Sequence, residues 1–362
     1  MIVSLSNGLL YICFAVVMGG CILSIVPENK KPAITLTNVM IGFAVILIPL
    51  LALVPVIDLA MVLNHYREES YLSSVGYIIT NLSVGTSWLA LTFLAIVFVI
   101  LLSVFKKRTY NRFIYVIGIV LTFAMILTQA VVGHASNMGI VAGATSHVFH
   151  YAAISSWVGV LLLVSWLSTN QENWRGFLRW FTPLAIGCVA TLAMSGFLMS
   201  YFITDNIIHS LALPYGQGLL WKYLLFLPVL IFALINGLLI KQKMKQDNLY
   251  SPRNWWRAES IILLVIFTVT AVLTEQETPQ NVEHTLARGE ASILFQTFAS
   301  VPASAELTYQ VTGISVLFLT LGVFFLGLII YSFRQMRSPA ISLLMAFIGV
   351  LSLYFGIMSG LG

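Results

Sequence analysis

The sequence has few charged residues. Lys, Arg, Asp and Glu together make up 9% of its 362 residues, whereas about a quarter of a typical soluble domain is charged. Hydrophobic residues make up 59%, and the mean hydropathy is +0.96. So few charges cannot cover a surface that faces water, and a large apolar core would still need a polar shell. The composition therefore indicates a protein whose solvent is lipid.

Cysteine is also scarce, and common catalytic motifs are missing. Cys13, Cys21 and Cys188 lie in apolar stretches, with neither zinc-binding spacing nor a disulfide framework. The sequence has no Walker motif, no Gly-x-Ser-x-Gly or His-Glu-x-x-His motif, and no Cys-x-x-Cys-His for covalent haem. We therefore expect neither an ATP-driven pump nor an enzyme. The net charge of +5 does not indicate a nucleic-acid partner, because the basic residues lie in short loops between apolar runs.

Apolar stretches long enough to cross a bilayer recur along the whole chain. About ten transmembrane helices are expected, near residues 9–26, 36–63, 76–104, 113–134, 146–167, 181–203, 217–240, 258–274, 311–332 and 340–360. The predicted fold class is an all-α polytopic transmembrane helix bundle. No Lys or Arg precedes the first run, so we expect a retained helix and not a cleaved signal peptide. The apolar stretch 291–301 is too short to span and is expected to be interfacial or re-entrant.

The basic residues divide unevenly between alternate loops. One set of loops holds fifteen of the eighteen Lys and Arg residues, the other set holds two, and Lys222 sits within a span. Because cytoplasmic loops carry the excess of Lys and Arg, the basic side is predicted to be cytoplasmic. Both termini are then extracytoplasmic, and the protein is expected in the bacterial cytoplasmic membrane.

Histidine shows an independent bias toward the opposite side. All six histidines are predicted at outer helix ends or in outer loops: His65, His134, His147, His150, His209 and His284. His147 and His150 are three residues apart and so share a helix face. His134 ends the preceding span, and Met138 lies in the short loop between them. We expect these imidazoles to converge near the outer surface, where they are suited to copper, zinc or haem iron.

Two further sets of side chains point to copper among the possible metals. Asp58, Met61 and His65 follow the spacing of one helix face. Met194 and Met199 lie toward the outer end of the sixth span, and thioethers select Cu(I) over harder ions. Each of these residues also has an ordinary alternative as an interfacial or packing side chain.

Three polar residues within predicted spans have simpler explanations. Lys222 is expected to snorkel toward the outer interface. Asn236 is expected to hold helices together. Glu259, close to Arg257, is expected to form an interfacial ion pair.

The middle of the chain, from about residue 130 to 280, carries a series of short motifs. They are Gly133-His134-Ala135, His150 followed by Trp157-Val-Gly159, Arg179-Trp-Phe181-Thr182-Pro183-Leu184-Ala185, Ser195-Gly196, Pro214-Tyr215-Gly216 with Leu220 and Lys222, Asn236, Arg257-Ala258-Glu259, and Leu273-Thr274. In this order they resemble the CopD family of bacterial copper-resistance membrane proteins.

The resemblance implies a multi-pass inner-membrane protein that handles copper, often beside a soluble copper-binding partner of the CopC type. It makes His134 and His150 the expected site, with Trp157 and Lys222 in support. His147 stands where the family tends to have Asp. The expected division is an N-terminal segment 1–112, a CopD-like core 113–280, and an outer loop with two helices in 281–362.

Three functions follow as hypotheses. The first is copper uptake across the membrane through an outward-facing His and Met site. The second is a b-type haem redox protein that uses His134 and His150, since CopD proteins also resemble membrane b-type cytochromes. The position of both histidines near helix ends counts against it. The third is a copper delivery or sensing protein that does not transport.

Overall fold

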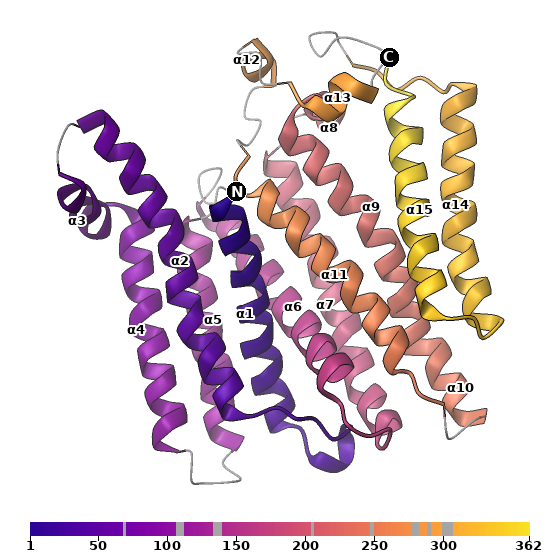
Figure 1. The fold of residues 1–362 in the computed structure, drawn as a ribbon, viewed down its shortest axis with the longest axis horizontal. Coiled ribbons are helices and arrows are strands. Elements are labelled where there is room, and N and C mark those ends of the chain that lie inside the picture. The colour runs from indigo at the N-terminus through magenta and orange to yellow at the C-terminus, as the bar shows by residue number, and fades with distance from the viewer. Residues whose placement is uncertain are drawn as a thin grey trace. The chain divides into compact units, whose positions relative to one another are not determined.

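The computed structural model describes residues 1–67, 70–105, 112–132, 140–203, 206–246, 250–276, 282–287, 291–298 and 307–362. The chain divides into two compact units, Met1–Phe202 and Ile203–Gly362, and each is described by itself (Figure 1). Ten helices in the described part are long and apolar enough to cross a membrane. This confirms the predicted all-α polytopic bundle. The division after residues 112 and 280 stays a prediction.

The first unit is built from seven helices. They are α1 (Ile2–Ile25), α2 (Asn38–Arg67), α3 (Tyr71–Asn81), α4 (Ser83–Val104), α5 (Arg112–Val132), α6 (Ile140–Leu167) and α7 (Trp174–Ile203). All but α3 are candidate spans. In this unit α1, α6 and α7 begin several residues earlier than the predicted spans. Their first residues have lower hydropathy than the centre of each span, so hydropathy placed the starts too late.

The third predicted span is two helices, α3 and α4. Leu82 is extended (φ −103°, ψ 145°) and separates them, and Ser70 caps α3 by accepting a hydrogen bond from the Ser73 N–H. The turn is tight, since a Cβ at Gly85 would lie 2.2 Å from the Ile78 carbonyl oxygen. The prediction of one helix over 76–104 was wrong because the apolar run is continuous across a break in the backbone.

Helices α1 and α6 run in the same direction and touch along their length. Tyr11 packs edge-on against Tyr151 at 5.6 Å between ring centroids. Further along, a Cβ at Gly159 would lie 1.9 Å from the Ala15 carbonyl oxygen, and one at Gly19 would lie 2.2 Å from the Gly159 carbonyl carbon. Such close approach of two backbones needs glycine, as is common between membrane helices.

The loops after α1 and α6 bind to each other at one end of this unit. Thr169 N–H donates to the Ala33 carbonyl at 2.8 Å, and Thr35 N–H donates to the Leu167 carbonyl at 3.1 Å. The indole of Trp180 in α7 donates to the Lys30 carbonyl at 2.9 Å. This is the end that carries the basic loops of the unit, and we call the opposite end of its helices the outer end.

The second unit also alternates long helices and short connections. Its elements are α8 (Ile207–Ser210), α9 (Pro214–Leu234), a π-helical turn (Ile235–Leu239), α10 (Ile240–Gln246), α11 (Arg253–Leu273), α12 (Val282–Ala287), α13 (Ile293–Phe298), α14 (Gly313–Arg334) and α15 (Pro339–Met358). The short helix α13 lies in the apolar stretch predicted to be too short to span. Its Phe295 is fully buried, and Ser292 N–H donates to the Ala212 carbonyl at 2.8 Å.

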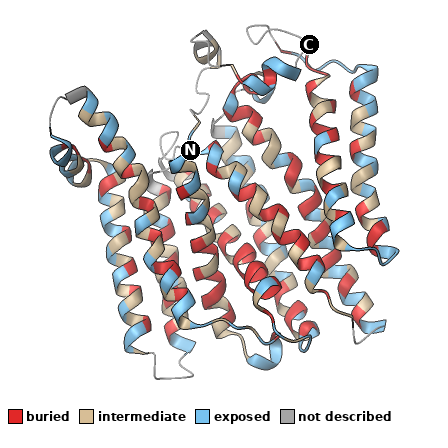
Figure 2. Cartoon of the chain, viewed as in Figure 1, coloured by how far each residue is buried: buried red, intermediate tan, exposed pale blue. Residues whose placement is uncertain are grey.

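Large apolar side chains remain exposed along several helices. Phe93 of α4 is 65% exposed and Phe324 of α14 is 57% exposed. Figure 2 shows exposed positions recurring along both helices. Water would disfavour such surfaces, whereas lipid accommodates them, so the burial pattern agrees with ten membrane-spanning helices.

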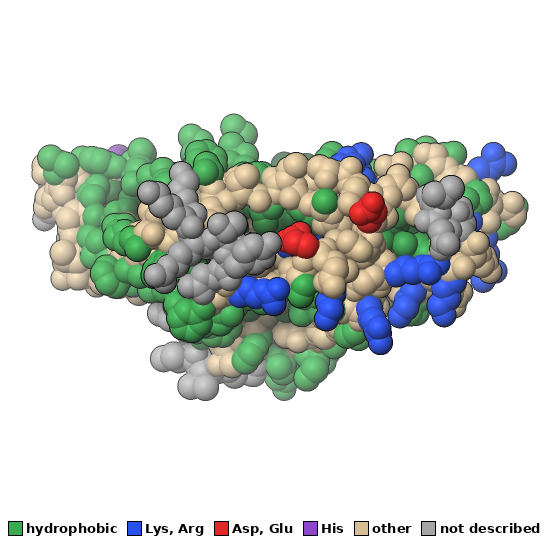
Figure 3. Space-filling model, turned by 90° about the horizontal axis from the view of Figure 1, so that it is seen from below, with side chains coloured by type: hydrophobic (Ala, Val, Ile, Leu, Met, Phe, Trp, Pro, Cys, Tyr) green, Lys and Arg blue, Asp and Glu red, His purple; other side chains and the backbone are tan. Residues whose placement is uncertain are grey.

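Basic side chains gather at one end of the helices. Figure 3 shows Lys and Arg side chains spread over this face. Within each unit, the chain order places the basic loops at a common end, because the helices between them cross in alternate directions. The assignment of this end to the cytoplasm, with both termini outside, stays a prediction.

Candidate metal site

The best-defined candidate ligand is His150 of α6, whose side chain faces α7 of the same unit. Its Nδ1 is 3.0 Å from Ser195 Oγ of α7. The Ser195 hydroxyl donates to the Thr191 carbonyl of its own helix at 2.6 Å. Since that bond uses the hydroxyl proton, Oγ accepts from His150, and Nδ1 carries the imidazole proton.

This hydrogen bond determines the chemistry of the imidazole. With Nδ1 protonated, Nε2 carries the lone pair that a metal ion needs. A ligand histidine whose other ring nitrogen donates to an oxygen is the usual arrangement at metal sites, because the second bond fixes both tautomer and ring orientation. In this tautomer Nε2 is the nitrogen through which His150 would bind a metal, and its role as a ligand stays a prediction.

His150 lies farther along its helix than the sequence indicated. His150 is ten residues after Ile140, where α6 begins, which is about 15 Å along the helix. Ser195 is eight residues before Ile203, where α7 ends, or about 12 Å. Helix α6 begins earlier than predicted, because the weakly apolar residues before His147 also form helix, so His150 is farther from the helix end than expected. This removes one argument against a haem ligand. A metal site at His150 stays a prediction.

The surroundings of His150 leave little spare room on the α7 side. A Cβ at Gly196 would lie 3.7 Å from His150 Cε1 and 3.9 Å from Nδ1. Gly196 therefore faces the ring edge that joins the two nitrogens. Met199 lies one turn beyond Ser195 and is half-buried, whereas Met194 is 69% exposed. Of the two predicted thioethers, only Met199 shares the face of Ser195.

His147 contacts a different neighbour. Its ring stacks on Tyr151 at 6.2 Å between centroids, and Tyr151 in turn packs edge-on against Phe14 of α1 at 5.0 Å. The spacing predicted a shared face for His147 and His150, and both are half-buried. The structure places the first beside Tyr151 and the second beside Ser195.

Two of the predicted ligands, His134 and Met138, lie outside the described residues. Within the described part of the chain, no three His, Cys, Asp or Glu side chains come together in a group that could hold a metal. The convergence of His134 with His147 and His150 thus stays a prediction.

The residues predicted on the second span do not join this site in the described structure. Asp58 and His65 are exposed on α2, and Met61 is 58% exposed. Helix α2 packs mainly against α1, α3 and α4. Asp58, Met61 and His65 therefore form a separate surface of the first unit, and their part in metal binding stays a prediction.

The residues predicted to support the site, and the two remaining histidines, lie in different parts of the chain. Trp157 is 1% exposed in the core beside the Gly159 crossing. Lys222 is half-buried in α9 of the second unit. His209 lies in α8 of that unit, and His284 lies in α12, with its side chain outside what is described.

Sequence reasoning did not assign Ser195 a role at the site. Its place in the Ser195-Gly196 motif is the signal in the sequence that points to it. A hydroxyl that turns toward a neighbouring helix is visible only in the fold.

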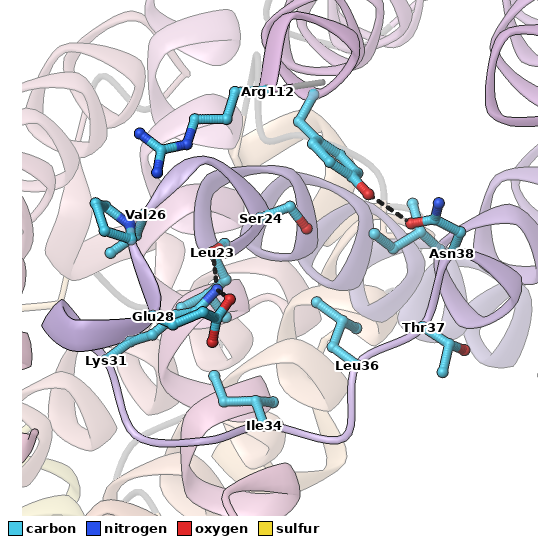
Figure 4. A pocket seen from close by; sticks show the side chains of 13 residues that line it. Leu23, Ser24, Val26, Glu28, Lys31, Ile34, Leu36, Thr37, Asn38 and Arg112 are labelled. Carbon is cyan, nitrogen blue, oxygen red and sulfur yellow. Dashed lines mark hydrogen bonds and ion pairs between the residues drawn. The ribbon is translucent and has the colours of Figure 1, made fainter. Parts of the chain in front are cut away.

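A pocket of about 210 Å³ lies at the basic end of the first unit. Figure 4 shows that Lys31 reaches inward, where its ammonium group contacts the Leu23 carbonyl at 2.7 Å and the Glu28 carboxylate at 2.9 Å. Tyr115 donates to Asn38 Oδ1 at 2.7 Å in the same view. The pocket lining contains no His, Cys or Met, so it does not compete with His150 as a copper site.

Comparison with known families agrees with these features. Residues 175–273 match the family described as copper resistance protein D, and residues 1–144 match its relative described as copper resistance protein D-like, N-terminal domain. Together the two matches cover more than half of the chain. The chain belongs to the CopD family. The likeness extends to the first spans, where the sequence motifs had shown none, and His147 and His150 lie between the two matched segments.

Two curated relatives cover about half of this CopD chain. Copper transport protein CutJ of Bacillus subtilis (strain 168) is 30% identical over 200 residues, which is 51% of this chain and 36% of CutJ. Inner membrane protein YebZ of Escherichia coli (strain K12) is 27% identical over 198 residues, or 50% of this chain and 66% of YebZ. The match therefore spans less than two thirds of either relative. No solved structure matches the chain. Its ten apolar helices and its likeness to YebZ identify a multi-pass protein of the bacterial inner membrane.

Proposed function

We propose that this CopD-family protein carries copper across the bacterial inner membrane, with His150 as a central ligand. The observation that carries the proposal is the hydrogen bond from His150 Nδ1 to Ser195 Oγ. It prepares a neutral imidazole well below the outer helix ends. The family match and the likeness to CutJ supply copper as the cargo.

The ligand set we propose combines imidazoles with thioethers. His150 binds through Nε2, and His134, His147 and Met138 complete the coordination from the outer side. Met199 offers a soft ligand one turn from Ser195, suited to Cu(I). Since the candidate ligands lie toward the outer end, we propose capture from outside and therefore uptake. A soluble partner of the CopC type is the proposed donor of the metal.

A haem-binding redox protein is the second candidate, and the depth of His150 favours it. A b-type haem needs axial histidines on neighbouring helices, within the membrane. The position of His150 ten residues inside α6 supports such a ligand, and His134 of the preceding segment is the proposed second ligand. The same pair of residues thus serves either chemistry, so the two functions must be separated by experiment.

The test is a visible spectrum with metal analysis of the purified protein, for wild type, His150→Ala and the control His209→Ala. We expect a colourless protein that binds copper, with binding lost in His150→Ala and kept in His209→Ala. His209 is a suitable control because it is another half-buried imidazole, in α8 of the second unit.

A Soret absorption band that disappears in His150→Ala would overturn copper transport in favour of haem binding. Copper binding that survives in His150→Ala would remove His150 from the site. If copper binds as expected, uptake into liposomes that contain the protein then tests transport itself.

A further inference from the structure

A buried carboxyl group joins two helices of the second unit. Glu259 of α11 is 1% exposed, and Asn236 of the π-helical turn is 2% exposed. Asn236 Nδ2 donates to Glu259 Oε2 at 2.6 Å and to the Trp255 carbonyl at 3.4 Å. Asn236 thus holds helices together as predicted. Glu259 was predicted to form an interfacial ion pair with Arg257. In the structure its carboxyl group instead faces Asn236 in the helix interface and is shielded from the surface.

Two oxygen atoms of this pair have no hydrogen-bond partner among the described residues. They are Glu259 Oε1 and Asn236 Oδ1. With an ionised carboxylate both atoms are acceptors, so neither can satisfy the other. Buried acceptors without a donor are costly, and an uncompensated carboxylate within a membrane is more so.

One proton on Glu259 would provide the hydrogen-bond donor that these two oxygen atoms lack. A protonated carboxyl group is a donor through one oxygen and an acceptor through the other, and a primary amide has the complementary pattern. Asn236 already donates to Oε2, so an O–H at Oε1 is matched in kind by the acceptor Oδ1 of the same amide. The protonated acid and the amide are thus complementary, with one donor and one acceptor on each side.

The pair is shielded by aromatic side chains, and among the described residues no ion pair with Glu259 is found. The Trp255 ring lies 5.8 Å from Phe232 and 5.0 Å from Phe333, so aromatic side chains enclose this end of the interface. Within α9, Lys222 and Tyr223 precede Asn236 by about 20 Å along the helix.

The remaining ionisable groups of the neighbouring elements lie at the edges. In α15, Tyr354 bonds to Gln217 at the far end of α9. Lys241 and Lys245 of α10 and Arg334 of α14 are exposed. Lys243 of α10 is half-buried, and its ammonium group lies over the rings of Tyr250 at 5.4 Å and Phe333 at 6.0 Å. Arg257 precedes Glu259 by two residues on α11 and is half-buried.

The pair also lies at an irregular point of the backbone. Asn236 belongs to the π-helical turn Ile235–Leu239, between α9 and α10 (Figure 1). Such turns interrupt the regular hydrogen bonding of a helix and are frequent at functional sites. A helix that changes direction or register does so most easily at such a point.

We infer that Asn236 and Glu259 form a proton-binding site that controls the contact between α9 and α11 and couples copper movement to protons. Glu259 holds the proton in the packed state. On release, its O–H bond breaks, the carboxylate keeps the electron pair, and the proton passes to water from the basic end. The unpaired carboxylate then separates from Asn236 at the π-helical turn. The coupling to copper rests on the proposed transport function, whereas the proton site does not.

The first experiment detects the proton directly, by infrared spectroscopy of the full-length protein in liposomes at neutral pH. We expect the C=O stretching band of a protonated carboxylic acid, absent in Glu259→Gln and present in Glu275→Gln. Glu275 is an exposed carboxylate just after α11, so the control loses the same chemical group elsewhere. The wild-type measurement needs no variant to fold. Absence of the band in wild type, or its persistence in Glu259→Gln, would overturn the proton site.

The second experiment measures copper uptake into the same liposomes with and without a pH gradient. Glu259→Gln reproduces the hydrogen-bonding pattern of the protonated acid, so we expect it to bind copper but to lose the response of uptake to pH. Glu275→Gln should respond as wild type does. A pH response that survives in Glu259→Gln would overturn the coupling. If wild type shows no uptake at all while the infrared band is present, the proposed transport fails and the proton site stands.

Discussion

At the scale of single residues, the hydroxyl of Ser195 decides how His150 is presented. Its proton is used by the Thr191 carbonyl, so its oxygen accepts from His150 Nδ1. The sequence predicted His150 as a ligand from its spacing to His147 and from its motif. It could not assign the tautomer, because Ser195 is 45 residues away. The role of the imidazole therefore depends on a neighbouring helix.

Replacing Ser195 by Ala should weaken copper binding without abolishing it. Without the hydrogen bond, His150 rotates more freely and populates both tautomers. Loss of such a second bond lowers metal affinity by about 10-fold to 100-fold. The measurement is a competition titration with a copper chelator, which compares the variant with wild type.

The matched control for this variant is Ser200→Ala, on the same helix. The Ser200 hydroxyl donates to the Gly196 carbonyl of α7 at 2.9 Å, so its removal should leave the affinity near the wild-type value. Equal affinities for Ser195→Ala and wild type would show that Ser195 does not position the ligand.

At the scale of elements, the crossing of α1 and α6 sets the position of the site. The two helices run in the same direction, and the contact of Gly19 with Gly159 fixes their separation. His150 and Trp157 lie on the same helix as Gly159, so the site inherits its position from this contact. The glycine of the Trp157-Val-Gly159 motif thus allows the close approach of α1, which the sequence did not reveal.

Gly159→Ala should destabilise the first unit. Its Cβ would fall 1.9 Å from the Ala15 carbonyl oxygen, and a backbone atom cannot yield as a side chain would. We expect a loss of about 1–3 kcal/mol in the free energy of unfolding, the usual range for overpacking. Unfolding in mixed detergent micelles, followed by circular dichroism, measures it.

Gly187→Ala in α7 serves as the control, because a Cβ there meets nothing within 4 Å. It should leave stability unchanged or raise it by about 0.5–1 kcal/mol, since alanine favours a helix more than glycine does. If both variants unfold alike, the helix crossing is not as tight as described.

At the scale of the whole molecule, the distribution of charge sets the expected orientation. The basic loops lie at one end of the helices in each unit, and the binding of the loops after α1 and α6 gathers that end in the first unit. His150 lies in the half of α6 that begins at the outer end, whereas the pocket is lined by residues at the basic end of α1. Copper taken up from outside would therefore meet the imidazole before it met the basic end.

Single cysteines at Glu172 and Glu275 should report this orientation. Both positions are exposed, the first in the loop between α6 and α7 and the second after α11. In intact spheroplasts, a membrane-impermeant maleimide should label Glu275→Cys and leave Glu172→Cys unlabelled until the membrane is opened. The native cysteines are buried and are replaced beforehand. Labelling of the opposite pattern would reverse the proposed direction of capture.

The sequence by itself determined the class of protein, the number of spans and the placement of the basic loops. These follow from composition, run length and loop charge, which are local properties of the chain and need no knowledge of contacts. Because hydropathy is a local property, it also led to two errors in the predicted helices. Hydropathy joined α3 and α4 across the extended residue Leu82, and it began α6 too late, so His150 was placed nearer the helix end than it is.

Only the tertiary structure decided which side chains meet. The hydrogen bond between His150 and Ser195, and that between Asn236 and Glu259, join residues that are 45 and 23 positions apart. Neither pair follows from a helical period, because the two partners stand on different helices whose rotation and depth are set by packing. The chemistry of an imidazole or a carboxyl group within a membrane depends on which partner packing supplies, since no water is there to replace it.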